Sequence, residues 1–175
     1  APGTVDAHYE SVTRRIFEQR DGMAHVILDA RHMRVPNYRL GIRTDQPPIV
    51  ADTLEALAAK LGLPAAALAA TVAEYNAACV AGEWKPLELD HLATRGLAPP
   101  KSNWALPIEE APFHAYPIIS ANVFTFGGVK VDSQARVLDG DGQPIAGLYA
   151  AGEIIGTYYR VYTGATSVLK GLVFG

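Results

Sequence analysis

The last quarter of the sequence holds a carboxylate and a glycine-containing helix start close together. Glu153 ends the segment GLYAAGE, and TGATS (163–167) precedes an apolar run that is typical of a helix. A helix start leaves several backbone N–H groups without partners and carries roughly half a positive charge. Such a start suits a phosphate, a carboxylate or an electron-rich ring carbonyl. We therefore interpret residues 153–169 as a candidate site for an anionic or electron-rich group.

A second group of charged side chains follows a predicted strand in the first third of the sequence. The run AHVILD (24–29) is short, apolar and β-branched, which predicts a buried strand, and Arg31 and Arg34 come soon after it. Arginine can hold a carboxylate through its fixed fork of donors. The functional interpretation is a guanidinium delivered to a carboxylate or a proton-transfer site, and the alternative is a solvated loop.

The elements that would position these groups are helical in the first half of the chain. Apolar spacing predicts a helix over 6–19, capped by Asp6. Two short helices joined by Gly62-Leu63-Pro64 follow; Asp52 is the expected cap of the first, and Gly82 the expected end of the second.

The second half of the chain changes to a different pattern. A proline-punctuated connector without periodicity covers 83–112, which is typical of a lid or an interdomain linker. Short strands follow from Phe113, with a turn at 139–142 that closes a hairpin. The fold class that we expect is α+β, with a domain boundary near Glu110.

Composition excludes several classes of function. The chain has 175 residues, of which 49% are hydrophobic, and its net charge of −3 comes from 15 basic and 18 acidic residues mixed along the sequence. No basic patch marks a nucleic-acid partner, and no apolar run approaches the roughly 20 residues that a bilayer requires. The single cysteine, Cys79, can form neither an internal disulfide nor a zinc cluster, and a small buried residue is its simplest role. We expect a cytoplasmic protein without nucleic-acid, membrane or metal partners.

Several motifs, in their order and spacing, resemble a known family. These are FTFGGVKVD, ARVLD, PIAGLYAAGE and GATS, preceded by TLEALAAKLGLPAAALAATVAEYNAAC and PPKSNWALPIEEAPFHAYP. The first set resembles the C-terminal part of the FAD-dependent dehydrogenases of the fumarate reductase and succinate dehydrogenase flavoprotein family. The second set resembles that family's cap domain and its return to the FAD domain. The nearest likeness within the family is to tricarballylate dehydrogenase and the 3-ketosteroid dehydrogenases.

The resemblance implies a fold, a cofactor and a reaction. Residues 1–110 would form a helical or mixed cap domain, and residues 111–175 the β-rich C-terminal segment of a Rossmann-like FAD-binding domain whose N-terminal GxGxxG segment is absent from this sequence. The chain would then be a fragment, inactive alone and binding FAD weakly or not at all. It would need the missing segment as a partner and could self-associate. The full-length enzyme would transfer hydride between flavin N5 and a CH–CH or C=C bond of a small substrate, carboxylated or not.

The resemblance also assigns residues to the cofactor. Glu153 matches the family glutamate that accepts a hydrogen bond from the FAD ribitol, and a solvent-facing carboxylate is the alternative. Ser167, Val168 and Leu169 match the helix start whose backbone N–H groups face the flavin pyrimidine. A positive helix end there stabilises the negative charge of a reduced flavin.

On the substrate side the sequence departs from the fumarate reductases. Phe124 and Thr163 stand where those enzymes carry a histidine and an arginine that hold a substrate carboxylate, which argues against fumarate. Arg160, with Tyr159 among the neighbouring tyrosines, would form a replacement wall, although such tyrosines can also serve packing alone.

Proton transfer is the remaining role. The family's proton-shuttling arginine falls between Arg31 and Arg34, and His114 is a further candidate acid, with a structural histidine as the alternative. A different class of function also stays open at this point: a non-catalytic α+β binding or interaction module.

Overall fold

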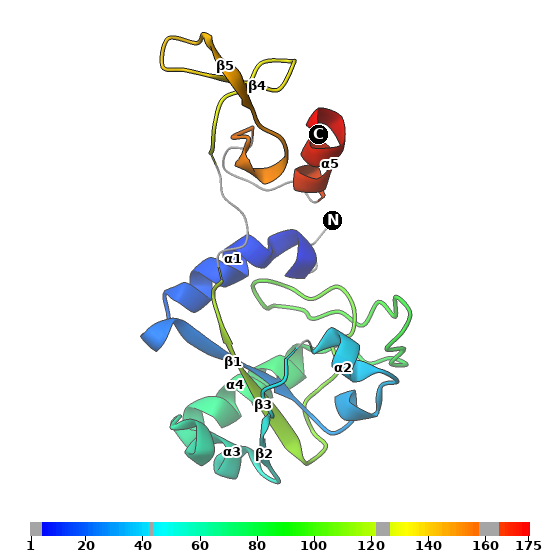
Figure 1. The fold of residues 1–175 in the computed structure, drawn as a ribbon. Helices are drawn as coiled ribbons and strands as arrows, with labels where there is room; N and C mark the ends of the chain where they lie inside the picture. The colour runs from blue at the N-terminus through cyan, green and yellow to red at the C-terminus, as the bar shows by residue number, and fades with distance from the viewer. Residues whose placement is uncertain (1–4, 43, 122–126, 158–164) are drawn as a thin grey trace. The chain divides into compact units, whose positions relative to one another are not determined.

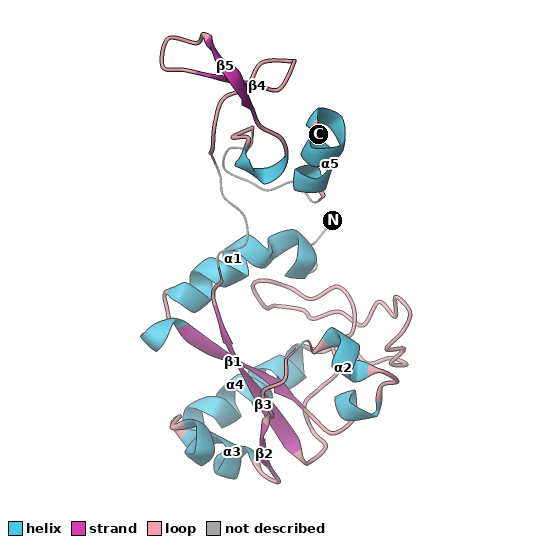
Figure 2. Cartoon of the chain, viewed as in Figure 1, coloured by secondary structure: helices cyan, strands magenta, loops and turns pink. Residues whose placement is uncertain are grey.

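The computed structural model describes residues 5–42, 44–121, 127–157 and 165–175. The chain divides into two compact units, Ala1–Ser120 and Ala121–Gly175 (Figure 1). Both units mix helices with strands, as Figure 2 shows, so the mixed character expected from the sequence is confirmed.

A three-stranded antiparallel sheet forms the centre of the first unit. Its strands are β1 (Met23–Leu28), β2 (Ile49–Ala51) and β3 (Phe113–Ile119), in the order β1-β3-β2. Strand β1 confirms the strand that we predict for AHVILD, but its residues are exposed or partly exposed rather than buried. Because β3 pairs with both other strands, the first compact unit continues to Ser120, beyond the domain boundary that we predict near Glu110.

Six helical segments occur in the part of the first unit that the structure describes. They are α1 (Val5–Phe17), η1 (Arg20–Gly22), η2 (His32–Arg34), α2 (Tyr38–Gly41), α3 (Leu54–Leu61) and α4 (Ala65–Ala78), where η marks a 3-10 helix. Helix α1 confirms the helix expected near the N-terminus, with Asp6 inside it rather than before it. Within the described residues, no helix or strand occurs between α4 and β3, as the proline-rich sequence there predicts.

The α3–α4 hairpin supplies the hydrophobic core beside the sheet. Gly62 ends α3 in the left-handed conformation, with φ 67°, as predicted. The expected cap was wrong: the side chain of Thr53, not of Asp52, accepts a hydrogen bond from the Ala56 N–H, at 3.1 Å. Helix α4 also ends at Ala78, before Gly82. The core consists of Ala51, Leu57, Ala58, Leu68, Val72, Phe113 and Ala115.

The second unit is smaller. Strands β4 (Arg136–Leu138) and β5 (Pro144–Tyr149) form an antiparallel hairpin, followed by η3 (Gly152–Ile154) and α5 (Thr166–Phe174). The hairpin turn at 139–142 is where the sequence predicts it. No helix in the described part of either unit is both long and apolar enough to cross a membrane.

Candidate functional site

In the second unit, η3 and the start of α5 lie together and carry the predicted cofactor residues. Glu153 belongs to η3, and Ser167, Val168 and Leu169 belong to the first turn of α5. Lys170 connects the two elements: its Nζ lies 3.7 Å from Glu153 Oε2. The structure therefore brings all four predicted cofactor residues into one region, with a lysine that the sequence did not single out.

Two glycines hold η3 in place. The Val129 N–H donates to Ile154 O at 3.0 Å, and the Gly156 N–H donates to Val129 O at 3.1 Å. A Cβ on Gly128 would lie 2.1 Å from Ile154 O, and one on Gly156 would lie 2.5 Å from Gly128 N. Only glycine permits this close backbone approach. Gly128 and Gly156 therefore fix the segment that carries Glu153.

The start of α5 has an unusual backbone and an apolar surface. Its N-cap, Ala165, has φ 65°, in the left-handed region, and the Leu169 N–H donates to Ala165 O at 3.1 Å. The side chains of Val168 and Leu169 are more than half exposed. A carboxylate next to an apolar helix start matches the chemistry of a flavin, which combines a flat apolar ring system with hydrogen-bonding edges and a ribitol chain. The residues present in the second unit fit FAD.

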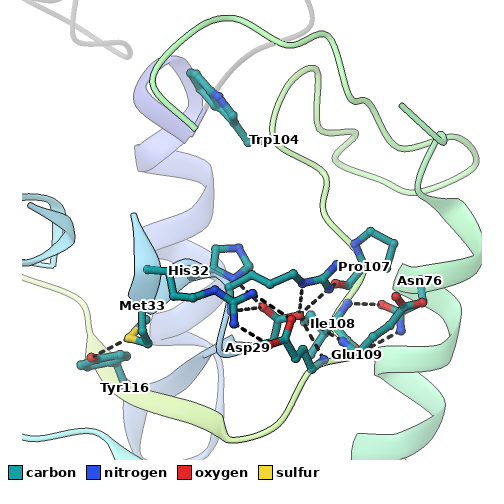
Figure 3. Close-up of polar contacts among 12 residues, drawn as sticks. Asp29, His32, Met33, Asn76, Trp104, Pro107, Ile108, Glu109 and Tyr116 are labelled. Atoms are coloured by element: carbon teal, nitrogen blue, oxygen red, sulfur yellow. Dashed lines mark hydrogen bonds and ion pairs between the residues drawn. The ribbon is translucent and has the colours of Figure 1, made fainter. Parts of the chain in front are cut away.

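In the first unit, Arg31 belongs to a network around the buried carboxylate of Asp29 (Figure 3). The Asp29 side chain is fully buried and accepts hydrogen bonds from Arg31 Nε at 2.9 Å and from Arg31 N at 3.0 Å. The Glu109 and Glu110 N–H groups also donate to it, at 3.2 and 3.3 Å. The Arg31 guanidinium donates further to Pro107 O. Arg31 and Asp29 thus join the end of β1 to the chain just before β3.

This network determines the charge state of Asp29. Burial alone would raise the pKa of Asp29, but the hydrogen bonds from Arg31 and from the Glu109 and Glu110 backbone lower that pKa to about 2. The bond to Asp29 raises the pKa of Arg31. His32 Nδ1 lies 3.2 Å from Asp29 Oδ1, yet burial of the ring lowers the pKa of His32. The centre of the network is therefore an Asp29–Arg31 ion pair beside a histidine that favours the neutral form.

The remaining candidates of the first unit lie apart from Asp29. Arg34 forms an exposed two-bonded ion pair with Glu110. His114, on β3, lines a pocket of about 360 Å³ together with Met33 and Arg39. Burial lowers the pKa of His114, and among the described residues its Nδ1 has no hydrogen-bond partner.

Four residues of the predicted substrate side, Phe124, Tyr159, Arg160 and Thr163, lie outside the described residues. Their proposed roles stay predictions.

Sequence reasoning missed three polar residues that hold this structure together. Asp29 is the last residue of the run that we predict as a strand, and Lys170 lies in the apolar run that we predict as a helix. The amide of Asn76, on α4, donates to Ile108 O at 2.9 Å and accepts from the Ile108 N–H at 2.7 Å (Figure 3). Ile108 is 32 positions from Asn76, and Glu109 and Glu110 are 80 and 81 positions from Asp29, so no local pattern could reveal these contacts.

Comparison with known proteins places this geometry in a family. The family model described as "FAD binding domain" matches residues 4–169. This chain belongs to that family. Its cofactor is FAD, and the resemblance to the fumarate reductase and succinate dehydrogenase flavoproteins is confirmed.

Individual relatives are oxidoreductases. The chain is 37% identical to the 4-oxocyclohexanecarboxylate 2-dehydrogenase of Sinomonas cyclohexanicum, over 86% of this chain and 28% of that protein. It is 44% identical to the NADH:acrylate oxidoreductase of Vibrio harveyi, over 62% of this chain and 10% of that protein. The open conformation of a flavocytochrome c3 fumarate reductase matches with a TM-score of 0.66 and 27% identity, over 94% of this chain and 27% of that one. This chain thus spans less than a third of the length of each.

Proposed function

We propose that this chain forms the cap and one wall of the flavin site in an FAD-dependent oxidoreductase. The observation that supports this most strongly is the meeting of Glu153 and the α5 start in a chain of the FAD-binding family. Bound FAD would supply the hydride chemistry for oxidation or reduction of a CH–CH or C=C bond. The rest of the FAD-binding domain is the proposed partner of the second unit.

The cofactor residues have distinct proposed tasks. Glu153 accepts a hydrogen bond from the ribitol hydroxyls, and the backbone at Ser167 to Leu169 faces the pyrimidine edge of the ring. The positive end of α5 stabilises negative charge that develops at that edge on reduction. The exposed apolar side chains of Val168 and Leu169 keep water from the ring.

A small carboxylated compound is the proposed substrate class. The names of two relatives, a 4-oxocyclohexanecarboxylate dehydrogenase and an acrylate oxidoreductase, each contain a carboxylate. Arg160 is the proposed partner of that carboxylate, and Tyr159 part of the same wall. Phe124 and Thr163, in place of the fumarate reductase ligands, make fumarate itself a poor candidate.

Proton transfer by Arg31 or Arg34 stays a prediction with a physical condition attached. Asp29 and Glu110 raise the pKa of their arginine partners, so both guanidiniums keep their protons. Either arginine can take part in proton transfer only if water relays the proton, or if a neighbouring group lowers the pKa of the arginine during turnover. Arg34 is the more exposed of the two and is the better placed for such a relay.

The test uses the full-length flavoprotein that contains these residues. We expect it to purify with visible flavin absorption. Anaerobic addition of an oxidisable carboxylate such as 4-oxocyclohexanecarboxylate should bleach the oxidised flavin, and addition of a reducible carboxylate such as acrylate to the prereduced protein should restore the absorption. A full-length protein that neither contains flavin nor regains flavin absorption on reconstitution would refute the proposal in favour of the non-catalytic binding module. A cytoplasmic location is proposed from the composition and is tested by cell fractionation.

A further inference from the structure

Lys170 is a buried charge in a helix that is otherwise apolar. Lys170 is 5% exposed. Its Nζ donates to Ile155 O at 3.0 Å and lies 3.7 Å from Glu153 Oε2. Taking an ammonium out of water is costly, and an apolar residue of similar volume is often as stable or more stable at such a place. Stability alone therefore gives little reason for a lysine here.

The contacts of Lys170 suggest what the charge does. Ile155 O lies directly after η3, and Glu153 lies within η3, so one ammonium group holds the backbone and the carboxylate of the same short segment. Leu169, the neighbour of Lys170 in α5, belongs to the turn that is assigned to the flavin edge. The lysine thus connects the two cofactor-binding parts of the second unit.

We infer that Lys170 is a positioning residue for FAD, which holds the Glu153 carboxylate in the orientation that receives the cofactor. This inference rests on the proposed role of Glu153. Since the lysine acts through Glu153, its removal should weaken FAD binding without a direct contact between Lys170 and the cofactor. Its positive charge, on the same wall as the α5 start, should also favour the reduced, negatively charged flavin.

The experiment measures FAD affinity by fluorescence titration of the full-length apoprotein, as wild type and in five variants. Lys170→Met removes the charge at similar length, and we expect about a tenfold weaker affinity, because the partly buried Glu153 carboxylate loses the cation beside it. Lys170→Arg should restore most of the affinity because it keeps the cation. Glu153→Gln should lose affinity alone, and adding Lys170→Met to it should cause little further loss. Lys60→Met, on α3 of the first unit, is the matched control and should bind as the wild type does.

Two further readouts separate positioning from folding. Circular dichroism should show that Lys170→Met keeps its secondary structure, and the flavin midpoint potential of that variant should fall.

If wild type binds FAD and Lys170→Met binds it equally well, the inference is wrong while the proposed function stands. Equal losses for Lys170→Met in the wild-type and Glu153→Gln backgrounds would also overturn it, because the lysine would then not act through Glu153. If wild type does not bind FAD at all, the proposed function fails first. Should Lys170→Met fail to fold, the comparison of Lys170→Arg with Glu153→Gln decides: an Arg variant as weak as the Gln variant contradicts a role for the cation.

Discussion

Asp29 shows how a single side chain can join distant parts of the chain. Its carboxylate has no exposed surface, and Arg31 and two backbone N–H groups near residue 110 compensate for the lost water. A buried carboxylate that loses its cation keeps the cost of burial without the compensation. The stability of the first unit should therefore depend on this ion pair much more than on the exposed pair of Arg34 with Glu110.

Replacing each arginine in turn tests this difference. We expect Arg31→Met to lower the free energy of unfolding by about 3 kcal/mol, because Asp29 then stays buried without its cation. Arg34→Met should cause no measurable change, since both partners of that pair are largely exposed. Urea denaturation followed by circular dichroism measures both. Equal losses from the two variants would show that burial of Asp29 does not matter.

The pH dependence of stability provides a second test of Asp29. Its pKa is about 2 in the folded chain against the ordinary 3.8, so the unfolded chain takes up a proton first as the pH falls. The stabilisation is fully present above the ordinary value and is lost between about pH 5 and about pH 2, and it amounts to about 2 kcal/mol. In Asp29→Asn, the unfolding free energy should lose this part of its acid dependence. If the unfolding free energy of Asp29→Asn depends on pH as that of the wild type does, other carboxylates cause the dependence.

Among the elements, α3 shows how a local signal can be displaced by one residue. Thr53→Ala should lower the free energy of unfolding by about 1 kcal/mol, because the Ala56 N–H loses its acceptor. Asp52→Ala should have little effect, as its side chain does not cap the helix in the structure. Thermal denaturation of the two variants decides, and a larger loss for Asp52→Ala would restore the cap that the sequence predicts.

The contact of Gly128 with η3 is a second test at this scale. Gly128→Ala would place a methyl group 2.1 Å from Ile154 O, a backbone atom that cannot move aside alone. We expect a loss of about 3 kcal/mol or more in the second unit. Gly140→Ala is the control, since its Cβ would meet no atom within 4 Å. Limited proteolysis within residues 127–157 measures how readily this segment unfolds, and equal cleavage rates for the two variants would contradict the prediction.

The elements also show what sequence reasoning can and cannot reach. Strand β1, the α3–α4 hairpin and the β4–β5 turn follow from local periodicity and turn residues, and the structure confirms them. The position of β3 between β1 and β2 depends on pairing across most of the first unit, which no local window contains. In the site, family motifs indicated Glu153 and residues 167–169. The sequence did not indicate Lys170, because its contacts with Ile155 and Glu153 join positions at least 15 residues apart.

At the scale of the whole chain, α5 leaves much apolar surface exposed. Leu172 and Val173 are 76% and 73% exposed, in addition to Val168 and Leu169. Apolar surface of this kind favours association. We expect the 175-residue chain alone to self-associate, and Leu172→Glu with Val173→Lys to reduce the association. Sedimentation velocity over a range of protein concentrations measures it. A wild-type chain that stays monomeric throughout would contradict this expectation.

The left-handed backbone of Ala165 has a consequence for how this sequence can change. For a residue with a Cβ, that conformation costs roughly 1 kcal/mol or more, whereas for glycine it costs almost nothing. Ala165→Gly should therefore stabilise the folded chain. The greater conformational freedom of glycine in the unfolded chain offsets part of this stabilisation. With alanine at this position, the chain has a strained helix start beside its candidate cofactor wall. A screen for heat-resistant variants should therefore recover Ala165→Gly, a change beside the candidate cofactor wall that is selected for stability and not for FAD binding.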